Sequence, residues 1–158
     1  MSKKYKSKRK NLGNDMRFKG YDYVIKEYSN LSPSFYKKYF DKCINNLDSD
    51  TSKIKALINL MENQLLPKYA IDRMFSVYES FNETIESFSG PITNYYTNWK
   101  LYRGLFWETF STTQKFSEQF FLENLDKMNI IIINNRINPW ARPENQSEEL
   151  KVFLMLKN

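Results

Sequence analysis

Apolar residues recur at intervals of three and four along most of this 158-residue chain, which is the pattern of amphipathic helices. The clearest stripe lies in residues 71–88 and consists of Ile71, Met74, Phe75, Tyr78, Phe81, Ile85 and Phe88. The sequence Ser89-Gly90-Pro91 predicts the end of this helix, because glycine favours a left-handed cap and proline cannot continue the turn.

A second stripe follows in residues 92–110, formed by Ile92, Tyr95, Trp99, Tyr102, Phe106 and Phe110. The alternation of Thr93, Tyr95, Thr97 and Trp99 is also typical of a strand, but the segment is longer than an ordinary strand. We therefore prefer a helix, followed by a break at residues 111–113 and a further helix to about Lys127. The aromatic residues of positions 75–121 are expected to supply most of the core.

The N-terminal half contains two further helical patterns after a short amphipathic piece at residues 21–31. Ser32-Pro33 predicts a helix start, since serine caps free amide groups and proline suits the first helical position. A loop at residues 45–52 separates that helix from the next one, which ends near Pro67.

The pattern of apolar residues in the C-terminal region differs from that of the helices before it. Residues 130–133 are four consecutive isoleucines bounded by Asn129 and Asn134, which indicates a short buried strand. Residues 152–156 form either a helix that Ser147 caps or a strand that pairs with the isoleucines.

These patterns predict a mostly α fold, a small helical bundle of about five helices, with a short β element near the C-terminus as an open alternative. Residues 21–158 are expected to form a single domain. Residues 1–20 lack apolar periodicity and predict a disordered basic arm.

Charge is concentrated in that arm. Residues 1–20 hold eight of the 24 basic residues and one of the 18 acidic residues, so the remaining chain has 16 basic and 17 acidic residues. The arm is therefore expected to contact nucleic-acid phosphate or an acidic protein surface. The candidate nucleic-acid-binding residues are Lys3, Lys4, Tyr5, Lys6, Lys8, Arg9, Lys10, Arg17 and Lys19.

The sequence contains few of the residues and motifs that catalytic sites use. The chain has no histidine, which excludes the commonest general base and the common zinc sites. Its four glycines are scattered, so no phosphate-binding loop is present. We expect a protein that is not an enzyme and needs no cofactor or metal.

One catalytic alternative remains at the C-terminus. Glu149-Leu150-Lys151 resembles the Glu-x-Lys element of metal-dependent nucleases, in which a strand presents the pair. That resemblance implies that an earlier acid, here Asp126, completes a divalent-ion site.

Three aromatic residues lie off the main stripes, namely Tyr96, Trp107 and Phe121. They belong to a broad core, to an exposed partner interface, or to a base-stacking platform. We take them as the candidate partner interface.

The leading functional hypothesis is a structural or interaction subunit of a viral or phage particle, or of a ribonucleoprotein. The bias toward Phe, Tyr, Met, Ile, Asn and Lys is what an AT-rich genome encodes, which favours a viral, phage or AT-rich bacterial source. The alternative is a virus-encoded inhibitor that binds a host protein. The single cysteine, Cys43, and the lack of a membrane-spanning run favour a reducing intracellular compartment or a virion.

Overall fold

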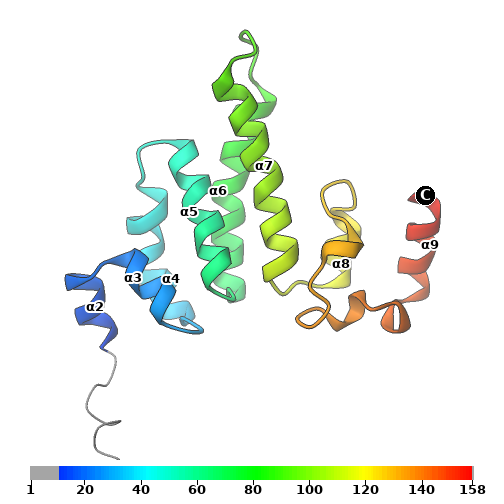
Figure 1. Cartoon of the computed structure of the whole chain (residues 1–158), viewed down its shortest axis with the longest axis horizontal. Helices are drawn as coiled ribbons and strands as arrows, with labels where there is room; N and C mark the ends of the chain where they lie inside the picture. Colours follow the sequence, from blue (N-terminus) through cyan, green and yellow to red (C-terminus); the bar gives the residue numbers. More distant parts are fainter. Residues whose placement is uncertain (1–10, 158) are drawn as a thin grey trace, which may run out of the picture.

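The computed structural model describes residues 11–157, which form eight α-helices and no β-strand (Figure 1). The helices are α2 (Leu12–Phe18), α3 (Tyr21–Glu27), α4 (Pro33–Phe40), α5 (Asp50–Asn63), α6 (Lys68–Glu86), α7 (Asn94–Thr113), α8 (Glu118–Glu123) and α9 (Glu148–Lys157). A π-helical turn (Asp41–Asn45) extends α4, and single 3₁₀ turns occupy Ile130–Ile132, Pro139–Ala141 and Pro143–Asn145. The predicted helical fold is confirmed, whereas about five helices is too few for the described residues.

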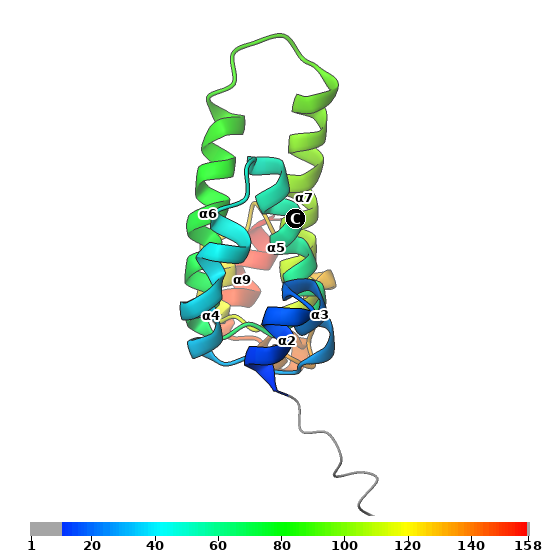
Figure 2. The same ribbon diagram turned by 90° about the vertical axis from the view of Figure 1, so that its left-hand side faces the viewer.

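The helices lie in two layers, which Figure 2 shows side by side in a view along the long axis of the stack. In one layer α5 packs against α3 and α7, and in the other α4 packs against α6. Helix α8 extends the second layer, because the ring of Phe120 in α8 lies 5.5 Å from that of Phe75 in α6. The chain therefore builds three consecutive helix pairs, α3–α4, α5–α6 and α7–α8, which stack side by side as in helical-repeat proteins.

Buried side-chain amides join these pairs where the first helix of each pair ends. Gln64 follows α5, and its Nε2 donates to the carbonyls of Ile25, at 2.7 Å, and Tyr28 at the end of α3. Its Oε1 accepts the backbone N–H of Leu31 at 3.2 Å. One glutamine thus satisfies the end of the preceding helix and the connection that follows it.

Gln114 repeats these contacts one helix pair later. Its Nε2 donates to the carbonyls of Met61 at 3.1 Å and Gln64 at 2.9 Å, and its Oε1 accepts the N–H of Leu66 at 2.8 Å. The two acceptor carbonyls have the same positions relative to the end of α5 as the acceptors of Gln64 have relative to the end of α3.

Asn138 makes the last of these side-chain amide contacts. Its Nδ2 donates to the carbonyl of Gln114 at 2.9 Å, and its Oδ1 accepts the N–H of Phe116 at 2.8 Å. Gln64, Gln114 and Asn138, which we call the amide ladder, are each 4% exposed or less. The last carbonyls of a helix have no partner within that helix, so the ladder satisfies buried groups and fixes how each pair meets the next.

Aromatic side chains fill the core where α6, α7 and α8 meet. The ring of Phe75 contacts five others at centroid distances of 5.2–6.2 Å, those of Tyr78, Phe106, Trp107, Phe110 and Phe120. Edge-to-face and tilted pairs of this kind add to the free energy that apolar burial supplies. The aromatic stretch therefore builds the centre of the described fold.

Two helix predictions are confirmed in detail. Ser32 caps α4 by accepting the N–H of Phe35 at 3.4 Å, and Pro33 is the first residue of that helix. Residues 94–113 form the helix α7 and not a strand. The predicted helix to Lys127 is wrong in length, because α8 ends at Glu123.

The structure corrects the predicted arm. Leu12–Phe18 forms α2, which packs against α3, and the hydroxyl of Tyr28 donates to the carboxylate of Asp15 at 2.7 Å. The prediction that this segment is disordered is therefore wrong. Residues 1–10 lie outside the described residues.

The predicted β element is wrong as well. Residues 130–132 form a 3₁₀ turn, in which Asn129 Oδ1 accepts the N–H of Ile131 at 3.0 Å. Ser147 Oγ accepts the N–H of Leu150 at 3.1 Å and starts α9. A strand needs a neighbour to pair with, and the expected neighbour, residues 152–156, is helical.

Removal of one side-chain amide of the ladder is expected to lower the stability of the fold strongly. Gln114→Ala is expected to lower the free energy of unfolding by about 3 kcal/mol, because each buried group left without a partner costs about 1–3 kcal/mol. The matched control, Gln119→Ala, removes an exposed amide and should cost less than about 0.5 kcal/mol. Urea denaturation measures both, and equal losses would contradict a structural role for Gln114.

Candidate functional site

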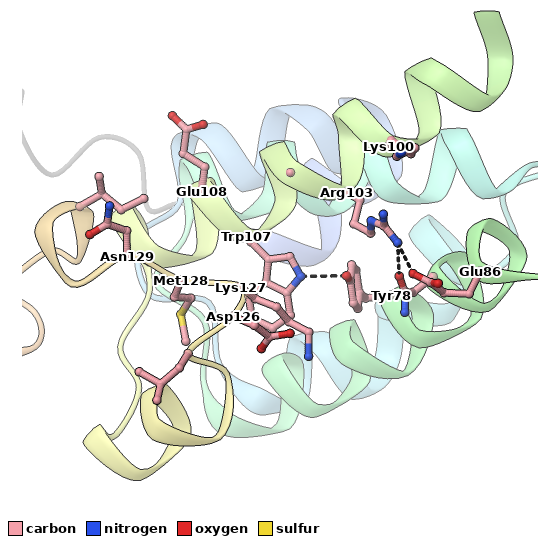
Figure 3. Close-up of a pocket in the computed structure, with 14 residues that line it drawn as sticks. Tyr78, Glu86, Lys100, Arg103, Trp107, Glu108, Asp126, Lys127, Met128 and Asn129 are labelled. Atoms are coloured by element: carbon pink, nitrogen blue, oxygen red, sulfur yellow. Dashed lines mark hydrogen bonds and ion pairs between the residues drawn. The ribbon is translucent and has the colours of Figure 1, made fainter. Parts of the chain in front are cut away.

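An open groove of about 820 Å³ lies between the α6–α7 pair and the segment that follows α8 (Figure 3). We call it the α6–α7 groove. It is lined by Tyr78, Asn82, Glu86, Lys100, Arg103, Gly104, Trp107, Glu108, Leu125, Asp126, Lys127, Met128, Asn129 and Ile132. It is larger than two neighbouring hollows of about 380 Å³ and about 430 Å³, and large concave surfaces are the usual binding sites of proteins.

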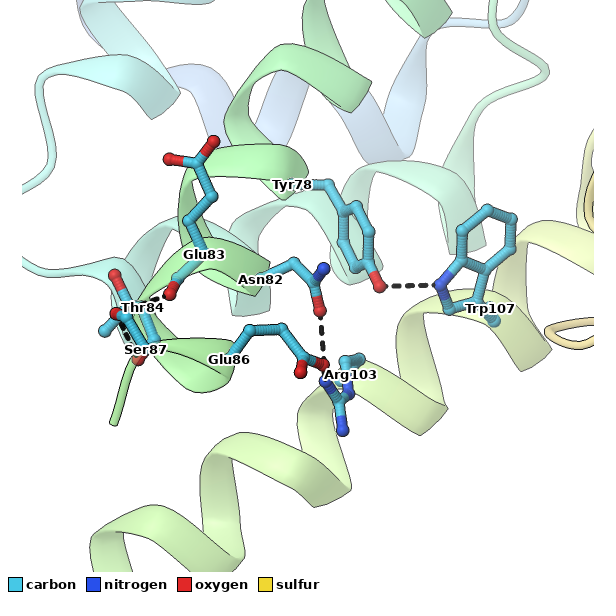
Figure 4. Close-up of polar contacts among 8 residues, drawn as sticks. All are labelled: Tyr78, Asn82, Glu83, Thr84, Glu86, Ser87, Arg103 and Trp107. Carbon is cyan, nitrogen blue, oxygen red and sulfur yellow. Dashed lines mark hydrogen bonds and ion pairs between the residues drawn. The ribbon is translucent and has the colours of Figure 1, made fainter. Parts of the chain in front are cut away.

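The floor of the groove is held by a buried hydrogen bond between two aromatic side chains. Trp107 Nε1 donates to the hydroxyl of Tyr78 at 2.8 Å, and the two residues are 7% and 2% exposed (Figure 4). Burial raises the pKa of Tyr78, so its hydroxyl stays neutral. The Lys127 ammonium lies 5.6 Å from the Trp107 ring centroid, which is cation–π distance.

The wall of the groove is polar. The Arg103 guanidinium reaches across from α7 to α6, where it bonds Asn82 Oδ1 at 3.0 Å and Glu86 Oε1 at 2.5 Å (Figure 4). Three basic residues, Lys100, Arg103 and Lys127, line the groove together with three acidic residues, Glu86, Glu108 and Asp126. This balanced charge does not select a polyanion and suits a surface of mixed polarity.

The candidate nuclease site is not formed in the described part of the chain. Within residues 11–157, no group of three Cys, Asp or Glu side chains could hold a metal ion. Glu149 and Lys151 lie in α9, where Lys151 pairs with Glu148 at 3.5 Å. The nuclease resemblance requires a strand, and side chains two apart on a helix do not share a face, so that arrangement is absent.

Most candidate nucleic-acid-binding residues precede the described part of the chain. Lys3, Lys4, Tyr5, Lys6, Lys8, Arg9 and Lys10 lie outside the described residues. Arg17 lies in α2 with its guanidinium 5.1 Å from the Phe18 ring, and Lys19 pairs with Asp15 at 4.0 Å. Their binding role stays a prediction.

The three off-stripe aromatic residues do not form one exposed patch. Phe121 is fully buried, with its ring 5.8 Å from that of Trp140, and Trp107 belongs to the groove floor. Both are buried because α7 and α8 are covered on more than one side. Tyr96 is partly buried and stacks on Phe88 at 4.6 Å near the tip of the α6–α7 pair. An interface role stays open for Tyr96.

The exposed apolar side of α9 is a surface that the sequence patterns did not identify. Val152, Met155 and Leu156 are 52%, 76% and 78% exposed. Their spacing of three and four, directly after the cap residue Ser147, is the signal that would have identified it.

No helix among residues 11–157 is long and apolar enough to cross a bilayer, in agreement with the prediction of no membrane span. Comparisons with protein-family models, curated proteins and solved structures gave no significant match. The architecture of residues 11–157 is a stack of helix pairs with an open lateral groove.

Replacement of Trp107, in the groove floor, is expected to lower the free energy of unfolding more than replacement of Trp99. Trp107→Phe should lower the free energy of unfolding by about 1–2 kcal/mol, because the buried Tyr78 hydroxyl loses its donor. Trp99→Phe is the matched control, since Trp99 Nε1 donates to Thr51 Oγ1 at 3.2 Å in a partly exposed position. Thermal unfolding compares them, and a larger loss for Trp99→Phe would contradict this description.

Proposed function

We propose that this protein is a non-enzymatic interaction subunit of a larger assembly, such as a viral or phage particle or a ribonucleoprotein. Its stacked helices form the body and offer the α6–α7 groove to a protein partner. Its basic N-terminal residues contact nucleic-acid phosphate or an acidic neighbour.

The unequal distribution of charge is the observation on which the proposal rests. Residues 1–10 contain six basic residues and no acidic residue, while residues 21–158 have nearly equal numbers of each. The groove, too, is lined by equal numbers of basic and acidic residues. Attraction to a polyanion is therefore expected from the N-terminal residues and not from the helical body.

The stack of helix pairs supports an interaction role for the body. Helical-repeat scaffolds expose long lateral surfaces, because each repeat buries itself mainly against its neighbours. The virus-encoded inhibitor of a host protein remains the second candidate, and the exposed apolar side of α9 favours it. In that case a one-to-one protein complex should survive high salt without residues 1–10.

Deletion of residues 1–10 tests the role of the basic segment. Binding of a fluorescent 20-mer duplex DNA and its RNA equivalent is measured between 50 and 200 mM salt. The slope of log K against log salt should fall in magnitude by up to about 5, since each lost phosphate contact contributes about 0.9. The deletion ends before Asn11, the N-cap of α2, so the helices of residues 11–157 should be retained, which circular dichroism checks.

The control replaces three exposed lysines of the body, Lys55, Lys68 and Lys115, by alanine. This variant should keep the wild-type slope. If the deletion variant binds both nucleic acids as the full chain does, the proposed role of residues 1–10 is wrong.

A further inference from the structure

The third helix pair is incomplete, and this leaves one end of the stack open. Helix α6 has 19 residues, whereas its neighbour α8 has six. Of the α6 and α7 residues that line the groove, Trp107 contacts α8 through Phe120, with ring centroids 6.4 Å apart, while Asn82, Glu86 and Lys100 lie nearer the connection between α6 and α7. A full-length α8 would cover them.

Helix α9 borders the same open end and has an unpaired apolar side. Leu150 is buried, while Val152, Phe153, Met155 and Leu156 are between 39% and 78% exposed. Neighbouring exposed apolar side chains of this kind indicate an association surface.

The groove and α9 are parts of one continuous surface. A second hollow, of about 430 Å³, is lined by Leu125, Asp126, Phe153 and Leu156. Leu125 and Asp126 line the α6–α7 groove as well. An apolar ridge, α9, thus lies beside a hollow in the same molecule.

We propose that a second copy of this chain closes the open end, with α9 of each protomer seated against the α6–α7 groove of the other. This inference names a partner for the groove and rests on the proposed interaction role. A two-fold axis places α9 of each protomer against the groove of the other protomer. The helices across the interface then follow the order α7, partner α9, α9, partner α7. Both apolar ridges are buried at once, and the assembly closes as a dimer.

Length fits this arrangement. The ten residues of α9 span roughly 15 Å, and the nine residues from Lys100 to Glu108 span roughly 13 Å. A helix of another protein that occupied this groove would still leave the apolar side of α9 exposed to solvent.

The buried area reaches what a specific dimer needs. The four exposed side chains of α9 offer on the order of 500 Å² per protomer. Two protomers then bury about 1,000 Å² from α9 alone, which is the lower limit for a specific interface, and the groove walls add to it.

The test is the molar mass of the nuclease-treated full chain, measured by light scattering from 1 to 100 μM. The expected mass is twice the monomer mass of 19.0 kDa. Met155→Glu combined with Leu156→Glu should weaken the dimer at least 100-fold. Gly104→Glu should do the same from the groove side, since a Cβ built on Gly104 meets no atom within 4 Å in the monomer.

Ile92→Glu serves as the control, because Ile92 is 81% exposed and lies outside the groove lining. It should leave the dimer intact. A chain that is monomeric over the whole range, or that binds only lipid vesicles or a foreign protein through α9, overturns the inference. A dimer that Gly104→Glu does not weaken overturns it too.

These measurements are made without nucleic acid, so they separate the inference from the proposed function. A monomer with salt-sensitive binding through residues 1–10 contradicts only the dimer. A dimer without affinity for nucleic acid or an acidic protein contradicts only the proposed role of the arm.

Discussion

The side-chain amides of Gln64, Gln114 and Asn138 pair with backbone groups that the ends of α3, α5 and α7 would otherwise leave buried and unsatisfied. Each amide uses both of its polar atoms, one on the preceding helix end and one on the connection after it. An unpaired buried carbonyl or N–H is costly, so the helix pairs can meet only in the register that satisfies all of these groups. The position of α7 relative to α5, and with it the floor of the groove, follows from that register.

The functional surface follows from where this stacking stops. The aromatic core fills the space between α6, α7 and α8, and the short α8 leaves the rest of α6 and α7 uncovered. The polar wall around Arg103 keeps that region compatible with water. In contrast, the exposed side of α9 offers mainly apolar area, and this difference is why we place the association surface at this end of the stack.

The sequence predicted the long helices well, because the buried faces of α6 and α7 repeat over several turns. It failed at residues 130–132 because a strand depends on a distant partner, and β-branched side chains alone cannot supply one. It also failed to identify the amide ladder, since glutamine is usually exposed and its burial depends on neighbouring helices. The signal is faint: Gln64-Leu65-Leu66-Pro67 and Gln114-Lys115-Phe116-Ser117 share a glutamine, an apolar residue and a helix-starting residue, which a search for internal repeats could have found.

Hydrogen–deuterium exchange of three backbone amides tests the central claim most directly. Leu31, Leu66 and Phe116 lie in the connections between helices, where amides commonly exchange fast, yet each donates to a side-chain amide of the ladder. We expect these N–H groups to exchange as slowly as those inside α5 and α7. Exchange at the rate of the exposed connection at residues 87–93 would show that the helix pairs are not joined in this way.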